Sequence, residues 1–261
     1  MAASICFARA VNAKLLEVPG LERNSHCRWV RPPSQGRERH GAGDYLPRHV
    51  HEDAFATVVL TGGYVEAGDT GRHRAEPGDA LIHGPYEFHL DHFDRGSTEV
   101  LVVPVEAGRF SCTAGRLPDL DAIVHLLEDD PAAAEEAIRE QIEPKPLALP
   151  DWPDILAHDL SNDPALSLSE WADRHRLSAG SVSRGFGQVY GVTPAAYRLL
   201  QRTHRAIRAI LGSEAPLAAL AQNCGFADQA HMVRSVRRAT GLAPHALRAR
   251  GRVRHPSRDV K

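Results

Sequence analysis

The chain has 261 residues, of which 43% are hydrophobic and 25% charged, a composition typical of a globular protein with one large or two ordinary domains. No apolar run approaches the ~20 residues that a membrane-spanning helix needs, and the N-terminal segment lacks the continuous apolar core of a secretory signal. The four cysteines show no CxxC pairing, which argues against a disulfide framework or a thiolate zinc site and predicts free thiols in the cytoplasm.

The net charge of −2 hides an asymmetry between the two halves of the chain. Residues 152–261 contain 16 Lys and Arg against 8 Asp and Glu, which leaves 15 against 25 in residues 1–151. A basic half joined to an acidic half indicates that one domain binds a polyanion such as a nucleic acid. The alternative is chance together with a solvated Arg-rich tail, GRVRHPSRDVK.

Residues 40–105 are predicted to form β-structure. Three short runs of β-branched and apolar residues, at 56–60, 79–83 and 99–105, are separated by segments rich in Gly, Pro and Asp. Many short strands joined by such turns are typical of a β-sandwich or a β-barrel.

The pattern becomes helical after Pro118. Apolar residues recur at helical spacing within 119–142, and Pro131 after two aspartates predicts two short helices, the second of which starts at this proline. Four prolines within 143–153 predict an interdomain linker, and the chain from Asp154 onward is predicted to be helix and turn.

The C-terminal half contains an internal repeat. The segment SRGFGQVYGVTPAAY (183–197) recurs as VRSVRRATGLAPHAL (233–247). Four residues match at an offset of 50, namely Arg184 with Arg234, Phe186 with Val236, Gly191 with Gly241 and Pro194 with Pro244. Two unrelated helical hairpins would not keep Arg, Gly and Pro at one common offset.

Each copy has the features of a helix-turn-helix unit. Ala172 and Ala221 are small enough for two helices to approach closely, and each lies five residues before an apolar residue of the turn. Ser178 and Asp228 are the predicted N-caps of the second helices. The matched glycines suit the left-handed position that ends these helices, and the matched prolines open the helices that follow.

These residues resemble the DNA-binding domain of the AraC family of bacterial transcription regulators. The resemblance covers 165–248 and rests on the doubled motif, the GF-x-D-x-x-x-x-x-R core and the closing G-x-x-P. The sequence departs from the family at Met232 and Val236, where Phe is usual, but both substitutes are apolar and core packing is expected to survive.

The family implies two helix-turn-helix units joined by a long helix, here at 194–211 and about 27 Å long at ~1.5 Å per residue. Such a helix would hold the two recognition helices in successive major-groove segments on one face of DNA. One subunit would then bind an asymmetric site, and a dimer would bind direct repeats.

The resemblance also implies which residues contact DNA. Base readout is expected from Gly180, Ser183 and Arg184 in the first unit and from Gln229, His231, Val233 and Arg234 in the second. Arg can pair with guanine and Gln with adenine, while a scaffold or phosphate role is the alternative for the repeat-matched Arg184 and Arg234. Phosphate contacts or solvated positions are expected for Arg198, Arg202, Arg205, Arg237 and Arg238.

Residues 40–105 resemble the cupin-type sensor domain common in AraC regulators, through GDYLPRHVHEDAFATVVLTGG and RAEPGDALIHGPYEFH. Metal-binding cupins have three His and a Glu in these segments; the matching residues are His49, His51 and His89, while Phe55 takes the Glu position. Three histidines with an open position suit zinc or iron. The alternative, which Phe55 favours, is an effector pocket without a metal. The remaining histidines of this half are expected at the surface or the pocket edge: His40, His73, His83 and His92.

The predicted fold class is α+β multidomain. The expected parts are a cupin-like β-barrel sensor domain (1–118), a helical hairpin for dimerisation or cover (119–142), a linker (143–153), an all-α domain with two helix-turn-helix units (154–250) and a basic tail (251–261). The expected function is a sequence-specific transcription regulator, an activator by the resemblance, in the cytoplasm and on the nucleoid when bound to DNA.

The expected partners are double-stranded DNA, RNA polymerase, a small-molecule effector and a second copy of the chain; enzyme activity, a cofactor and membrane contact are not expected. One alternative is a metal-dependent cupin enzyme with an accessory DNA-binding domain. Another keeps DNA binding and makes the barrel a dimerisation module without a ligand.

Overall fold

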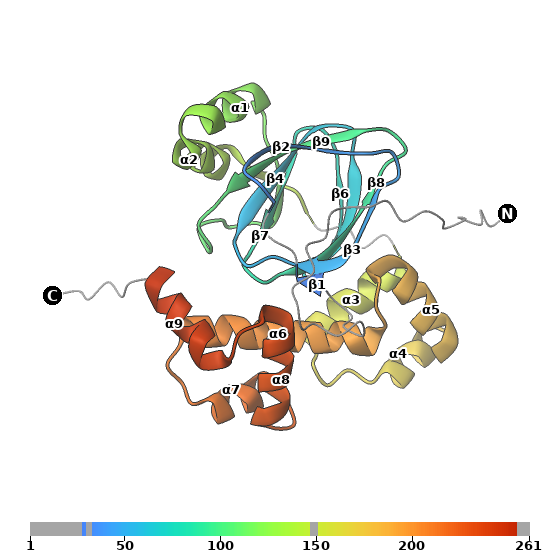
Figure 1. Cartoon of the computed structure of the whole chain (residues 1–261). Helices are drawn as coiled ribbons and strands as arrows, with labels where there is room; N and C mark the ends of the chain where they lie inside the picture. The colour runs from blue at the N-terminus through green and yellow to red at the C-terminus, as the bar shows by residue number, and fades with distance from the viewer. Residues whose placement is uncertain (1–27, 30–32, 147–150, 255–261) are drawn as a thin grey trace.

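Two β-sheets form the N-terminal half of the chain, which we call the β-domain. The computed structural model describes residues 28–29, 33–146 and 151–254, and Figure 1 shows the β-domain above a layer of helices. The strands are β1 (Arg28–Trp29), β2 (Gly36–His40), β3 (Tyr45–Val50), β4 (Phe55–Thr61), β5 (Tyr64–Gly68), β6 (Gly71–Ala75), β7 (Asp79–His83), β8 (Phe88–Phe93), β9 (Thr98–Pro104), β10 (Ala114–Arg116) and β11 (Glu143–Pro144). The five-stranded sheet has the order β1-β3-β8-β5-β6, and the six-stranded sheet has the order β11-β10-β7-β4-β9-β2.

The core of the β-domain lies between the two sheets. In β4, Phe55 and Val59 belong to a cluster with Tyr64 of the opposite sheet, while Ala56 and Val58 belong to the cluster on the other side of the strand. This division follows from the two-residue alternation of side chains along a strand. β4 is therefore buried on both faces, which explains its nearly continuous apolar sequence.

The closed cupin barrel expected from the sequence is not confirmed. Among the residues described, the hydrogen-bonded strand pairs join strands within each sheet and none joins one sheet to the other. The fold is thus a mixed α and β chain whose β-domain has two open sheets.

The predicted helical hairpin is confirmed as α1 (Leu120–Asp129) and α2 (Pro131–Gln141). The carboxylates of Asp119 and Asp130 accept hydrogen bonds from backbone N–H groups in the first turns, as N-caps do. Ile123 and Ile138, fully buried, pack against the outer side of the six-stranded sheet. The predicted linker begins with β11, which pairs with β10, and its residues 147–150 lie outside the described part of the chain.

The C-terminal half, residues 151–254, is the helical domain. Its helices are α3 (Trp152–Asn162), α4 (Leu168–Arg174), α5 (Ala179–Tyr190), α6 (Pro194–Gly212), α7 (Leu217–Asn223), α8 (Gln229–Thr240) and α9 (Pro244–Arg254). The predicted bridging helix is confirmed as α6, one residue longer than expected and roughly 28 Å long at ~1.5 Å per residue. No helix in the described ranges is both long enough and apolar enough to span a membrane.

The two helix-turn-helix units, α4–α5 and α7–α8, have the same local geometry. The N–H of Leu177 donates to the Ala172 carbonyl at 2.9 Å, and the N–H of Phe226 donates to the Ala221 carbonyl at the same distance. The predicted caps are confirmed, because the Ser178 hydroxyl and the Asp228 carboxylate each accept a backbone N–H three residues on. Both recognition helices end at a glycine with φ of 71°.

The β-domain docks on the helical domain through its five-stranded sheet, with α6 running beneath it in Figure 1. Val50 and Phe88 pack with Ile207 of α6 in a cluster that continues into the second helix-turn-helix unit. Leu90 packs with Tyr190 in a cluster that continues into the first unit. One sheet therefore contacts both units.

Candidate nucleic-acid interface and buried histidine cluster

The residues of the first unit that are predicted to contact DNA bases lie at the N-terminal end of α5 and are exposed. Ser183 and Arg184 point outward while Val182 and Phe186 are buried, as the helical period requires. The Arg184 guanidinium lies over Gly180, so that a Cβ at Gly180 would come within 3.1 Å of its Nη1. This end of α5 thus presents a cationic group with little side-chain bulk around it.

In the second unit Gln229 and Arg234 are exposed on α8, and His231 and Val233 are half-buried. The His231 ring meets Phe226 of the turn edge-on, with the ring centroids 5.2 Å apart, so this histidine also packs within the unit. Across the described part of the chain, no ion pair includes the repeat-matched arginines of α5 and α8. This leaves them available to a ligand, and their role as base readers stays a prediction.

The arginines predicted to contact phosphates divide into two groups. Arg198 donates to the Leu166 carbonyl at 2.5 Å and Arg202 to the Pro164 carbonyl at 3.0 Å, so both tie α6 to the loop before α4. Arg205 similarly donates to the Ser161 carbonyl. The exposed arginines of this set are Arg237 and Arg238 in the last turn of α8. Phosphate contact stays a prediction for both groups.

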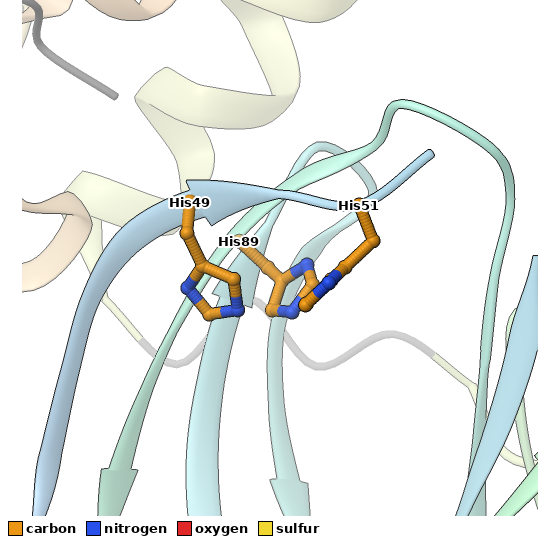
Figure 2. A group of neighbouring side chains, drawn as sticks. All are labelled: His49, His51 and His89. Atoms are coloured by element: carbon orange, nitrogen blue, oxygen red, sulfur yellow. The ribbon is translucent and has the colours of Figure 1, made fainter. Parts of the chain in front are cut away.

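The three histidines predicted to line the pocket do come together. Figure 2 shows His49 and His89 on neighbouring strands and His51 just beyond β3, with their rings turned toward one another. The ring centroid of His89 lies 4.3 Å from that of His49 and 5.3 Å from that of His51, and all three residues are buried. One ring nitrogen from each lies within 4.8 Å of the others, a grouping that suits a metal ion.

The expectation that His83 lies at the surface or the pocket edge is wrong. His83 is 4% exposed, at the end of β7, and it faces the same interior as His89, with ring centroids 4.7 Å apart. Phe55, predicted to stand in the carboxylate position, stacks on His83 at 4.4 Å and meets His51 edge-on. His73, predicted at the same places, is also buried.

A carboxylate that the sequence did not single out completes the cluster. Glu66 in β5 is 5% exposed, and its Oε2 lies 3.5 Å from the Nε2 of His83. Asp91 in β8 lies 4.0 Å from the Nε2 of His49. A charged residue inside the strand YVEAG is a signal that sequence reasoning could have used, but no strand was predicted there.

Burial sets the protonation of this cluster. It lowers the pKa of His49 and of His83 to about 3 and holds the pKa of His89 well below its usual range. Burial raises the pKa of Asp91 to about 8, and burial together with the charge of Asp91 raises the pKa of Glu66 well above its usual value. The imidazoles are therefore neutral near pH 7, the form in which histidine binds metals.

A buried ionic centre joins the opposite face of this sheet to the helical domain. Asp69, between β5 and β6, accepts hydrogen bonds from Arg48 and Gln201 at 3.0 Å, and its other oxygen lies 3.1 Å from the Nδ1 of His204. The Arg48 guanidinium lies 5.1 Å from the centroid of the Tyr197 ring. The side chains of the Arg48–Asp69–His204 triad are 2–9% exposed, so this contact is buried.

A second ionic contact lies at the edge of the same interface. Arg72 of β6 donates to Asp154 of α3 at 2.6 Å, and Tyr190 donates to the other oxygen of that carboxylate. On the far side, Arg250 of α9 pairs with Glu52. A cavity of about 250 Å³ opens beside that pair and is lined by residues of both domains, including Tyr86 and Leu211.

The helical domain matches a known family. Residues 171–250 match the family described as the helix-turn-helix domain. Among solved structures, ToxT from Vibrio cholerae is similar over 82% of this chain and 98% of its own, with 10% identity and a TM-score of 0.37. The DNA-binding domain of AdpA, solved in complex with a target DNA, is similar over 40% of this chain and 94% of its own, with 27% identity and a TM-score of 0.36. A comparison with curated proteins gives no match.

Proposed function

We propose that the chain is an AraC-type DNA-binding transcription regulator and that its β-domain controls DNA binding by direct contact with the helical domain. DNA is bound by the two helix-turn-helix units, with sequence read by the exposed residues at the start of α5 and on α8. The support is the exposure of Arg184, Gln229 and Arg234, together with the basic charge of the C-terminal half.

The regulatory part of the proposal is supported by the five-stranded sheet. One face of this sheet lines the histidine cluster, and the other face packs on the helical domain. In β3, His49 faces the interior cluster while Arg48 and Val50 face the helical domain. In β8, His89 faces the cluster while Phe88 and Leu90 pack on the helices. Because strand neighbours point to opposite faces, a ligand in the interior acts on the wall against which both helix-turn-helix units pack.

Control of this kind requires an effector that binds two docking arrangements with different affinity. Coupling free energies between such sites are about 1–3 kcal/mol, which corresponds to roughly 5- to 150-fold in DNA affinity. The interface is suited to two discrete arrangements, because packed interfaces switch between arrangements and do not deform continuously.

Activation through contact with RNA polymerase, and homodimerisation through the α1–α2 hairpin, are further parts of the proposal. The hairpin covers the six-stranded sheet with its buried residues, and Val124 and Leu126 remain half-buried. Light scattering of the purified chain would test the dimer: a monomer at all protein concentrations would contradict it.

The central experiment is selection of DNA by the purified full-length chain from fragments of the source genome, followed by affinity measurements on the enriched fragment. Gln229→Ala and Arg234→Ala should each weaken binding to that fragment by about 1–3 kcal/mol more than binding to random DNA. Gln222→Ala, at an exposed position on α7, is the matched control and should leave the preference intact.

Two results would count against this function. Failure of any fragment to be enriched would contradict sequence-specific binding. Equal losses on the enriched and the random DNA would show that Gln229 and Arg234 do not read bases.

A further inference from the structure

We propose that Glu66, His83 and His89 form a binding site for a divalent transition-metal ion, and that this ion is the species to which the β-domain responds. The second half of this proposal rests on the proposed regulatory function; the first half stands on the geometry alone.

The three residues meet from both sheets. Glu66 lies in β5 and His89 in β8 of the five-stranded sheet, while His83 lies at the end of β7 in the six-stranded sheet. Each is 4–5% exposed, and one possible ligand atom from each lies within 4.8 Å of the others. A bound ion would therefore join two sheets that share no hydrogen-bonded strand pair in the described part of the chain.

The donor set is typical of a borderline metal ion. Two neutral imidazoles and a carboxylate are ligands that Zn²⁺ and other divalent first-row ions accept, with a further position left for water or another donor. Hard ions such as Mg²⁺ prefer oxygen donors throughout, so this set disfavours them.

Two features show that the protein groups present do not satisfy the cluster by themselves. The Nδ1 of His89 is buried and has no hydrogen-bond partner within the described ranges, which is costly for a polar atom. The carboxyl groups of Glu66 and Asp91 are buried beside histidines, and no described ion pair joins either of them to Lys or Arg. A divalent cation supplies the positive charge that this interior lacks.

A second arrangement of the same cluster competes with this one. His49, His51 and His89 also bring their ring nitrogens together, but they include no carboxylate. The set with Glu66 offers the ion a carboxylate ligand and residues from both sheets. We therefore assign the ion to Glu66, His83 and His89.

The site is placed to influence docking. Glu66 is followed by Ala67, which packs on the first helix-turn-helix unit, and by Gly68, whose carbonyl accepts the Tyr197 hydroxyl. His89 lies between two residues that pack on the helical domain. An ion that draws β5 and β8 toward β7 acts directly on these contacts.

The test is titration of chelator-treated full-length protein with Co²⁺, whose visible d–d bands report tetrahedral coordination by nitrogen and oxygen, followed by displacement with Zn²⁺. Wild-type protein should bind one ion. Glu66→Gln and His83→Gln should each weaken Co²⁺ binding by at least about 100-fold, and His51→Gln by less than about tenfold. His92→Gln, at an exposed position on the same strand as His89, is the matched control and should bind like wild type.

X-ray absorption of zinc-loaded wild-type protein provides a measurement that does not depend on whether the variants fold. Two imidazoles with oxygen ligands are expected. Three imidazoles, or loss of binding in His51→Gln but not in Glu66→Gln, would overturn the assignment, as would wild-type protein that binds no Co²⁺.

The regulatory half is tested by DNA affinity with and without Zn²⁺. We expect a change of roughly 5- to 150-fold on the enriched fragment in wild type and no change in Glu66→Gln. A bound ion without any change in affinity would overturn this half. Sequence-specific DNA binding by a protein that takes up no metal would overturn the metal site and leave the proposed function intact. Metal binding without sequence-specific DNA binding would support the metal site and contradict the proposed function.

Discussion

Single arginines in the helical domain differ in what their guanidinium groups already contact. Arg198 and Arg202 donate to carbonyls of the loop before α4, and the Nε atoms of both are buried. Arg237 and Arg238 are exposed at the end of α8. The first pair therefore holds the domain together, whether or not DNA is bound, and the second pair is free to track a phosphate backbone.

This difference predicts separable effects of mutation. Arg237→Ala with Arg238→Ala should reduce the slope of log affinity against log salt concentration by up to roughly 0.9 for each lost phosphate contact, with an unchanged melting temperature. Arg198→Ala should instead lower the free energy of unfolding by about 1 kcal/mol, because it removes a hydrogen bond from a half-buried cation.

Salt titrations of DNA binding and denaturant unfolding would check both results. An unchanged salt slope in the Arg237 and Arg238 variant would show that these residues do not contact phosphates.

At the level of elements, the two repeat copies differ in their surroundings more than in their geometry. The C-terminal ends of α5 and α8 have the same left-handed glycine, but Gly191 contacts the β-domain and Gly241 does not. A Cβ at Gly191 would lie 2.8 Å from Cδ2 of Leu90, whereas a Cβ at Gly241 would have nothing within 4 Å. A substitution at Gly241 is therefore a matched control for the same substitution at Gly191, which lies at the docking contact.

Gly191→Ala and Gly241→Ala should each lower the free energy of unfolding by about 1–2 kcal/mol, because alanine is strained in the left-handed backbone conformation. Gly191→Ala should cost roughly 1–3 kcal/mol more, because the new methyl group overpacks the buried Leu90. Equilibrium unfolding of the two full-length variants measures the difference directly. Equal losses of unfolding free energy in the two variants would mean that the end of α5 does not contact the β-domain in solution.

At the scale of the whole molecule, the docking depends on one buried ionic centre. Asp69 is the side chain that Arg48 and His204 share, and it also accepts the Phe88 N–H. Removal of one member of a buried charge group leaves its partners unpaired, which costs about 3–5 kcal/mol.

Asp69→Asn should therefore weaken the docking so that the two domains unfold independently. Calorimetry should show one unfolding transition in wild type and two in the variant, since the β-domain has a core between its sheets and the helical domain packs most of its buried apolar residues among its own helices. Asp94→Asn is the matched control, because it breaks the exposed Arg74 pair within the β-domain and should preserve a single transition. A single transition in Asp69→Asn would indicate that other contacts maintain the docking.

The sequence predicts the helical domain better than the β-domain because the helical signals are short-range. The caps Ser178 and Asp228 and the glycines that end α5 and α8 act within one or two helical turns, so spacing alone locates them. In the β-domain only the most apolar strands were predicted, and β5, which bears Glu66, was not among them.

The histidine cluster illustrates the same limit. The resemblance to metal-binding cupins predicted that His49, His51 and His89 come together. His83 was placed at the edge, although β7 alternation puts it on the same side as the buried Leu81. Its contact with Glu66 joins two different sheets, and no local pattern predicts which strands of separate sheets face each other.

By itself, the sequence determined the two helix-turn-helix units, the length of α6 and the α1–α2 hairpin. Hydrophobic period, capping residues and a repeat are all encoded in neighbouring positions. Tertiary structure alone decided that the sheets stay open, that Asp69 ties the domains together and that a carboxylate joins the histidines. These features depend on residues far apart in the chain, whose proximity arises only when the sheets and helices pack.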